Sequence, residues 1–234
     1  MGIFGRHSQS ARDITQVAMV DHARAASTGR MIEHLLDVGI DGKGRFDSAR
    51  RVADVALAEH LDAESAIDAI VGSHLRIAAV GGFVTSLGGF VVMPIALPAN
   101  VLGFYLVATR MVAATVAARG YDIGKPEVRS AVLLALIGAD ADDLLKKAGY
   151  ASTGRLANLA VQRLPGPVLL VVNKGVEFRL LTQFGKRSLT RLGKAVPVVG
   201  GVVGAGVDAY LLNRIADHSR QEFPPKGTWS DPAH

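Results

Sequence analysis

The chain has 234 residues, enough for one large domain or two small ones, and its mean hydropathy of +0.28 is high for a soluble protein. Lys and Arg outnumber Asp and Glu by 26 to 21, and there is no cysteine, which excludes a disulfide framework, a thiolate nucleophile and a cysteine-ligated metal. Aromatic residues make up only 6%, so Ala, Val, Leu and Gly must fill the core, a composition that favours close helix packing.

The first part of the chain is predicted to be helical after a short polar start. It lacks the apolar segment of a signal peptide, so we expect a cytoplasmic protein. Apolar residues recur at helical spacing from about residue 11 to 38, and a Gly-rich loop follows. Ser48 is expected to cap the next helix, with Val52 and Val55 on its apolar face, and Asp62 is expected to cap the helix after it.

An uncharged segment, Ile77 to Thr109, is the longest apolar feature of the chain, with 33 positions free of charge. Pro94 and Pro98 each lack an amide donor and clash with the carbonyl four residues back. The pattern therefore predicts a helical hairpin with its turn at Pro94, Pro98 and Asn100. Three settings stay open for this hairpin: a buried core, insertion into one leaflet of a membrane, or a two-pass span with short arms.

Glycines mark this hairpin and a second apolar segment at 195–215. Small residues at helical spacing let another helix backbone approach closely, and close packing must offset a cost of roughly 1 kcal/mol for each Gly in a helix. We therefore expect the two segments to pack together at the centre of the fold. The predicted helix-packing glycines are Gly81, Gly82, Gly88, Gly89, Gly200, Gly201 and Gly204.

Helix start and stop signals follow the hairpin in order. Gly120 is predicted to end its second arm, Pro126 to begin a helix at the first position, and Gly138 to end that helix. A short helix is predicted from Asp140 to Lys147, with acids in its first turn and lysines in its last. Its acids are interpreted as a cap and first-turn acids rather than as a metal or acid–base site.

A basic amphipathic pattern precedes the second apolar segment. Residues 110–194 hold 14 Lys and Arg against 6 Asp and Glu, and the later cations alternate with Phe and Leu. A solvated face, an anionic membrane surface and nucleic acid are the alternatives, and nucleic acid is disfavoured because no recognition motif accompanies the charge. The membrane-surface candidates are Lys174, Arg179, Lys186, Arg187, Arg191 and Lys194.

Motifs of catalysis are absent or fail in their context. Residues 204–209 match a GxGxxA loop, but too few residues follow for a second strand, and there is no HExxH, P-loop or GxSxG. We predict no catalytic residue, no cofactor and no metal; a hydrolase with a dispersed site is kept as a third hypothesis. Arg110 and Asp208 lie in apolar surroundings, need partners if buried, and are hypothesised to pair with each other.

Three stretches, in the same order, resemble the EcsC family of bacterial proteins: GGFVTSLGGFVVMPIALPANVLGFYLVATRMVAATVAARGYD, KPEVRSAVLLALIG and VPVVGGVVGAGVDAYLLNRIADHSRQEF. The resemblance covers roughly residues 50–223, and Asn100 stands where the family often has Asp. The family's namesake is encoded beside the subunits of an ABC transporter. The resemblance implies a bacterial helical protein, cytoplasmic or membrane-associated, and supplies no catalytic residues.

The sequence thus predicts an all-α protein, a single helical domain built around a Gly-rich apolar helical hairpin. Residues 1–47 are expected to form an N-terminal helical extension, 48–223 the EcsC-like helical domain and 224–234 a disordered tail. The first function hypothesis is a non-enzymatic, membrane-associated protein that contacts an anionic membrane surface or a membrane-protein partner at the inner face of the cell membrane. The second is a soluble protein that binds a lipid or another apolar ligand between the walls of the hairpin.

Overall fold

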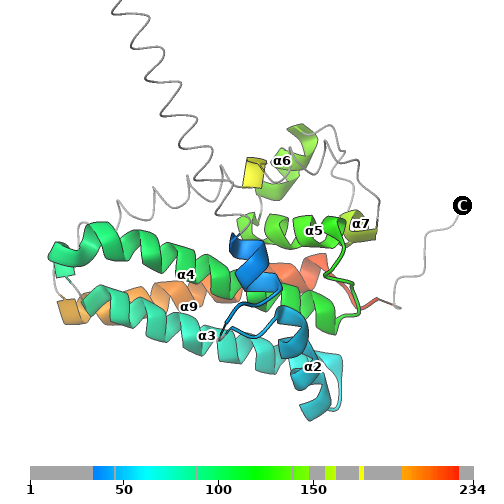
Figure 1. Cartoon of the computed structure of the whole chain (residues 1–234), viewed down its shortest axis with the longest axis horizontal. Helices are drawn as coiled ribbons and strands as arrows, with labels where there is room; N and C mark the ends of the chain where they lie inside the picture. Colours follow the sequence, from blue (N-terminus) through cyan, green and yellow to red (C-terminus); the bar gives the residue numbers. More distant parts are fainter. Residues whose placement is uncertain are drawn as a thin grey trace, which may run out of the picture.

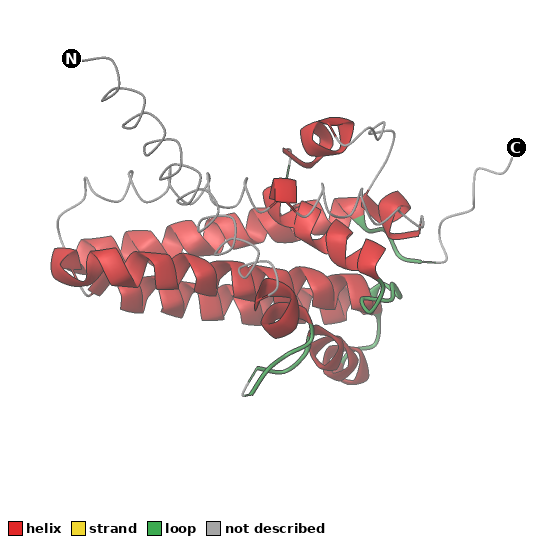
Figure 2. Cartoon of the chain, turned by 45° about the horizontal axis from the view of Figure 1, so that its top comes forward, coloured by secondary structure: helices red, strands yellow, loops and turns green. Residues whose placement is uncertain are grey.

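The structure, a computed structural model, describes residues 34–44, 46–87, 89–138, 140–147, 156–161, 174–176 and 197–226. Every regular element in these ranges is a helix, which confirms the predicted all-α fold (Figure 2). The elements are η1 (Leu35–Ile40), a π-helix, followed by α2 (Ala49–Glu59), α3 (Ala63–Leu87), α4 (Gly89–Ala118), α5 (Pro126–Ile137), α6 (Asp140–Lys147), α7 (Leu156–Val161) and α9 (Pro197–Glu222).

A bundle of α3, α4 and α9 forms the long axis of the molecule (Figure 1). α3 packs on both other helices, and α4 also contacts α9. α4 and α9 run antiparallel to α3, so the end of α3 and the beginnings of α4 and α9 lie at the same end of the bundle (Figure 1). The helices that carry the two apolar segments therefore pack together, but the segments lie at one end of the bundle rather than at the predicted centre of the fold.

The chain reverses before the prolines, and the predicted position of the hairpin turn is wrong. α3 ends at Leu87, α4 begins at Gly89, and α4 then runs without interruption through Pro94, Pro98 and Asn100. Gly89 is thus the first residue of α4, and Gly88 lies outside the described residues. Both prolines lie in the first third of the 30-residue α4, so packing along the rest of the helix can outweigh a cost of roughly 3 kcal/mol for each proline.

The predicted caps define the helix boundaries. Ser48 and Asp62 each accept a hydrogen bond from the backbone amide three residues later, at 3.2 and 2.8 Å. Gly120 and Gly138 follow α4 and α5 with φ angles of 88° and 59°, in the region that favours glycine. Pro126 is the first residue of α5.

The buried face of α2 consists mainly of alanines, and of the two predicted valines Val52 packs against the core. Ala49, Ala53 and Ala56 are buried, whereas Val55 is 47% exposed, so its predicted place on the buried face is wrong. α2 packs against both α3 and α4. Alanine has no side chain beyond Cβ, so α2 can lie close to these helices, and the larger Val55 falls on the outer side.

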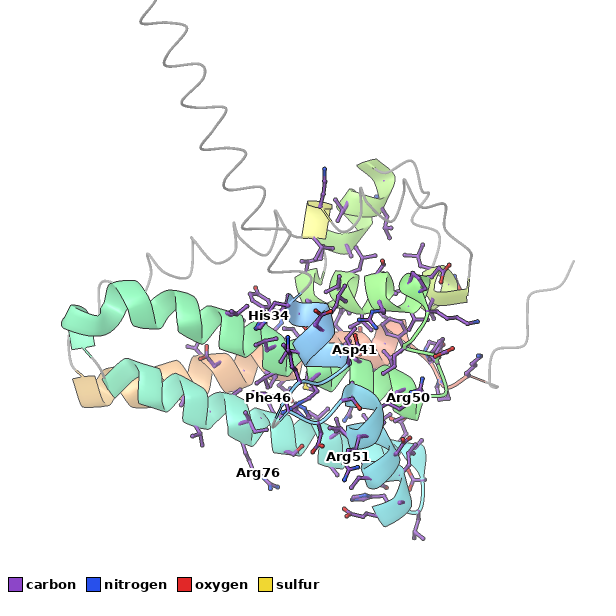
Figure 3. The ribbon with its side chains drawn as sticks, in the orientation of Figure 1. His34, Asp41, Phe46, Arg50, Arg51 and Arg76 are labelled. Atoms are coloured by element: carbon purple, nitrogen blue, oxygen red, sulfur yellow. The ribbon has the colours of Figure 1, made fainter. Side chains whose placement is uncertain are left out.

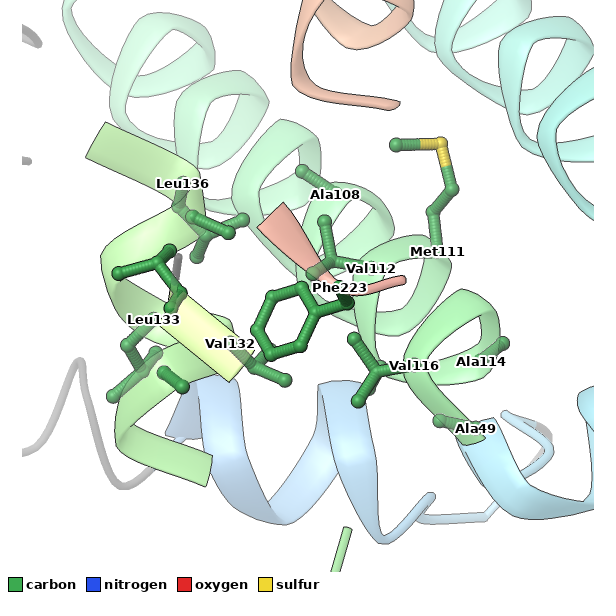
Figure 4. Close-up of a cluster of buried hydrophobic side chains, with 14 of the residues drawn as sticks. Ala49, Ala108, Met111, Val112, Ala114, Val116, Val132, Leu133, Leu136 and Phe223 are labelled. Atoms are coloured by element: carbon green, nitrogen blue, oxygen red, sulfur yellow. The ribbon is translucent and has the colours of Figure 1, made fainter. Parts of the chain in front are cut away.

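The core surrounds the second half of α4. Residues 111–116 are at most 1% exposed, because η1, α2, α3, α5 and α9 all contact this helix. Phe223, just after α9, is fully buried, and its ring lies between Val112 and Val116 of α4 and Val132 of α5 (Figure 4). The end of α9 is thereby fixed in the core.

The guanidinium group of Arg119 joins the three bundle helices at one end of the bundle. This end is opposite to the chain reversal between α3 and α4. Its Nη2 donates to both carboxylate oxygens of Glu64 on α3, at 2.7 and 2.9 Å. Its Nη1 donates to the backbone carbonyls of Arg220 and Phe223, both at 2.5 Å, and so satisfies carbonyls that the end of α9 leaves unpaired. The Arg119 side chain is only 7% exposed, whereas the Glu64 side chain is 52% exposed, so a buried guanidinium group clamps the helices together and its carboxylate partner reaches solvent.

Residues after α9 are also attached to the end of α4. The Tyr121 hydroxyl donates to the Pro224 carbonyl at 2.8 Å, and the Lys226 amide donates to the Arg119 carbonyl at 3.0 Å. The rest of the predicted tail and most of the predicted N-terminal extension lie outside the described residues. The three domain boundaries stay predictions.

We expect Arg119→Met to lower the free energy of unfolding by roughly 2 kcal/mol, because carbonyls at the end of α9 lose their donor while the half-exposed Glu64 carboxylate can be hydrated instead. Urea unfolding followed by circular dichroism measures the change. Arg50→Met is the matched control, since Arg50 makes an exposed ion pair with Asp122 at 3.0 Å, and pairs of this kind contribute about 0–1 kcal/mol. Equal losses in the two variants would contradict a clamp at Arg119.

Candidate functional site

The uncharged segments of three helices come together at one end of the bundle. Ile77–Leu87 of α3, Gly89–Thr109 of α4 and Pro197–Val207 of α9 contain no Asp, Glu, Lys or Arg. We refer to these three segments as the bundle tip. Among the described elements, only α3, α4 and α9 extend to its outer end (Figures 1 and 2). The bundle tip is therefore the candidate functional surface.

Large apolar side chains are exposed where α3 and α9 enter the bundle tip. Ile77 and Val80 on α3 are 44% and 64% exposed, and Val207 and Tyr210 on α9 are 42% and 62% exposed. Ala78, by contrast, is 6% exposed and faces the bundle. Each exposed apolar side chain forgoes roughly 25 cal/mol for every Å² it could bury, so a group of them is typical of an interaction surface.

The first exposed charged residues after the bundle tip lie at a similar height along the bundle on α3 and on α9. The Asp68–Arg220 ion pair, 2.6 Å long, sets the register between these antiparallel helices. Counting from this pair at about 1.5 Å per residue, Arg76 and Arg214 lie within about one helical turn of each other along the bundle. Both side chains are exposed, and Figure 3 shows Arg76 pointing away from α3.

On α4, charge resumes at this level with Arg110. Its Nε donates to Nε2 of His74 on α3 at 3.1 Å, and its guanidinium carbon lies 5.5 Å from the centre of the Phe46 ring. Burial lowers the pKa of Arg110, and the nearby carboxylate of Asp47 partly opposes that shift. The cation–π contact compensates part of the lost hydration. The hypothesised pair of Arg110 with Asp208, which is buried on α9, stays a prediction.

His74 is a buried neutral acceptor for Arg110. Because an arginine Nε can only donate, His74 Nε2 must be unprotonated, and the proton on Nδ1 is donated to the Ile70 carbonyl at 2.7 Å. Burial lowers the pKa of His74 from 6.5 to about 4; the bond to Ile70 opposes the shift and the charge of Arg110 adds to it. The ring therefore stays neutral near pH 7 and anchors Arg110 at the base of the bundle tip.

The predicted glycines lie on the helices of the bundle tip. Their contribution to packing stays a prediction, because the surroundings of these positions lie outside the described part of the structure. Gly81 and Gly82 are in α3, Gly89 begins α4, Gly200, Gly201 and Gly204 are in α9, and Gly88 falls outside the described residues.

The predicted basic surface is almost entirely outside the described residues. Lys174 is described and exposed. The other membrane-surface candidates are not described: Arg179, Lys186, Arg187, Arg191 and Lys194. Their role stays a prediction.

Three residues that hold the bundle together, two at the base of the bundle tip and one at its opposite end, were not identified from the sequence. His74 follows the apolar face of α3 at helical spacing from Ile67 and Ile70, a pattern that indicates burial. Arg119 directly precedes the cap glycine of α4, a position from which a cation can reach helix carbonyls. Phe46 lies in a loop and has no such local signal.

Two further expectations concern metals and loops. Within the described ranges, no three His, Asp or Glu side chains converge as metal ligands. The GxGxxA match at 204–209 lies inside α9 and forms helix rather than a phosphate-binding loop.

Across the described ranges, the helices lack the combination of length and apolarity needed for a membrane span.

Comparison with known proteins assigns the chain to a family. The model of the EcsC protein family matches residues 18–224, which is most of the chain, so the chain belongs to this family. The match confirms the resemblance seen over residues 50–223 and extends it toward the N-terminus. Neither the curated proteins nor the solved structures give a significant match.

We expect acid to weaken the fold through His74. Its pKa is about 4 in the folded protein, against an ordinary value of 6.5 for a solvated histidine, which the unfolded chain should have. The unfolded chain therefore binds the proton first, and stability is lost as the pH falls from about 6.5 to 4, by up to roughly 3 kcal/mol. His74→Gln keeps an acceptor for Arg110 but cannot titrate, so its stability should fall less over this range.

Urea unfolding at several pH values between 4 and 7 measures this difference. His60→Gln is the control, because His60 lies between α2 and α3, away from Arg110. A stability–pH slope that is unchanged in His74→Gln would show that His74 is not the titrating group.

Proposed function

We propose that this member of the EcsC family is a non-enzymatic, membrane-associated protein whose bundle tip enters one leaflet of a lipid bilayer. The observation that carries the proposal is the common level of Arg76, Arg110 and Arg214, the first cations that follow the uncharged segments of the three helices. Asp208, the first charged residue of α9, is buried. A flat boundary between apolar and charged surface matches the flat boundary between the acyl chains and the headgroups of a bilayer.

The α3 segment of the bundle tip has a length that favours one leaflet, whereas the α4 segment, Gly89–Thr109, is longer, at 21 residues. The part of α3 from Ile77 to Leu87 is about 16 Å long at 1.5 Å per residue, which is about half of the roughly 30 Å hydrocarbon core. A helix that crosses the whole core needs about 20 apolar residues, more than α3 has beyond Arg76. Helices also satisfy most of their backbone groups internally, which limits the cost of entering lipid.

The exposed side chains favour a membrane over an enclosed ligand site. A soluble protein that binds an apolar ligand would direct its large apolar side chains into a cavity. Val80 and Tyr210 instead are 64% and 62% exposed on the outside of α3 and α9. Side chains in these positions can contact a bilayer that surrounds the bundle tip.

We expect the wild-type chain to float with vesicles of phosphatidylcholine and phosphatidylglycerol. Val80→Lys should weaken that binding by about a hundredfold, because a Lys in the hydrocarbon costs roughly 2.5–3.5 kcal/mol. Val80 is exposed, so the substitution should leave the fold intact, which circular dichroism checks. Flotation over a range of lipid concentrations measures the affinity.

Leu61→Lys is the matched control for this experiment. Leu61 is also a fully exposed apolar side chain, but it lies before α3, at the end of the bundle away from the tip. Its substitution adds the same charge and should leave flotation unchanged. Wild-type protein that does not float, or equal flotation of the two variants, would contradict the proposal.

A further inference from the structure

We infer that Arg76 and Arg214 bind the phosphate groups of phospholipid headgroups where the bundle tip enters the membrane. The inference rests on the proposed function and names the lipid group that the protein contacts. Both side chains are exposed, and within the described ranges neither forms an ion pair. Exposed arginines farther from the tip do: Arg50 pairs with Asp122 and Arg51 with Asp47.

Each of these two arginines has an exposed apolar side chain four residues away. Val80 follows Arg76 on α3, and Tyr210 precedes Arg214 on α9. Residues four apart share a face of a helix. Because α3 and α9 are antiparallel, the opposite sequence orders put the apolar partner on the tip side of the arginine in both cases. We refer to the level of Arg76 and Arg214 as the arginine band. On both helices the apolar side chain lies nearer the tip than the arginine. This order is expected where a protein surface crosses from acyl chains to headgroups.

The chemistry of the arginine band suits a phosphate. A guanidinium group presents a planar fork of donors that matches phosphate oxygens and stays charged at all relevant pH values. The Tyr210 ring, 62% exposed, has an apolar body and a polar hydroxyl, the combination that places tyrosines at membrane interfaces. Arg110 is not part of the arginine band, because His74 and Phe46 already hold its side chain.

Nearby acids do not neutralise the two arginines. Asp217, the acid closest to Arg214 along α9, lies farther from the tip and accepts a hydrogen bond from Asn213 at 3.1 Å. Asp68 on α3 pairs with Arg220 at 2.6 Å. Among the described residues, the surface at the level of Arg76 and Arg214 therefore remains cationic.

The double variant Arg76→Gln with Arg214→Gln tests the inference. Each Arg near an anionic membrane surface contributes about 1 kcal/mol, so losing both should weaken binding to phosphatidylglycerol-containing vesicles by about 30-fold. The control is Lys125→Gln with Lys146→Gln, which removes two exposed cations from the start of α5 and from α6, outside the arginine band. It lowers the net charge equally and should bind within about threefold of the wild type.

A depth measurement accompanies this titration. With Trp229→Phe as background, Tyr210→Trp gives one indole at the arginine band, and Leu61→Trp gives one at the far end of the bundle. Lipids brominated near the headgroup should quench the first indole more than lipids brominated near the chain end, and neither should quench the second. Quenching of the first indole mainly by deep bromines would overturn the assignment of the arginine band to the headgroup layer.

The outcomes separate the inference from the proposed function. Wild-type binding with equal affinities of the arginine and lysine double variants would overturn the phosphate contact and leave the membrane proposal standing. A wild-type chain that binds no vesicle would overturn both. Wild-type binding that only the arginine variant weakens supports both.

Discussion

One buried guanidinium group sets the alignment of the three long helices. Arg119 stands at the end of α4 and donates at once to Glu64 near the start of α3 and to two carbonyls at the end of α9. A rigid, permanently charged fork tolerates little displacement of its acceptors once water is excluded. Because the helices are held together at this end, the number of residues from the clamp determines which side chains lie at the same height along the bundle. The clamp therefore brings the first cations after the bundle tip, Arg76, Arg110 and Arg214, to a similar height.

A second polar contact stabilises the bundle where its apolar part begins. His74 accepts from Arg110 and remains neutral because burial lowers its pKa. An acidic partner in the same place would add a second charge to desolvate, and buried ion pairs recover that cost only with very good geometry. A neutral imidazole together with the face of Phe46 holds the cation without that cost. The bundle can thus change from charged to uncharged surface over a short distance.

Local signals predicted the parts of the fold that depend on local chemistry. Ser48, Asp62, Gly120 and Pro126 stand where the sequence placed them, because caps and starts involve residues a few positions apart. The predicted position of the hairpin turn was wrong because the prolines and the glycines gave opposing local signals. The packing of a long helix, which is not a local signal, decided between them. The Arg119–Glu64 contact joins residues 55 positions apart and has no local signature. The predicted basic surface and glycine packing are not tested by the described residues.

The common level of Arg76, Arg110 and Arg214 also discriminates between kinds of partner. A protein partner needs complementary shape, and its charges can lie at any height on the three helices. A bilayer imposes one plane on every side of whatever enters it, because its headgroups form a continuous layer. α3 and α9 run in opposite directions, so their sequences must place cation and apolar residue in opposite orders to meet one plane. Arg76–Val80 and Tyr210–Arg214 have these opposite orders. The proposed lipid partner would therefore account for a pattern that a protein partner would not require.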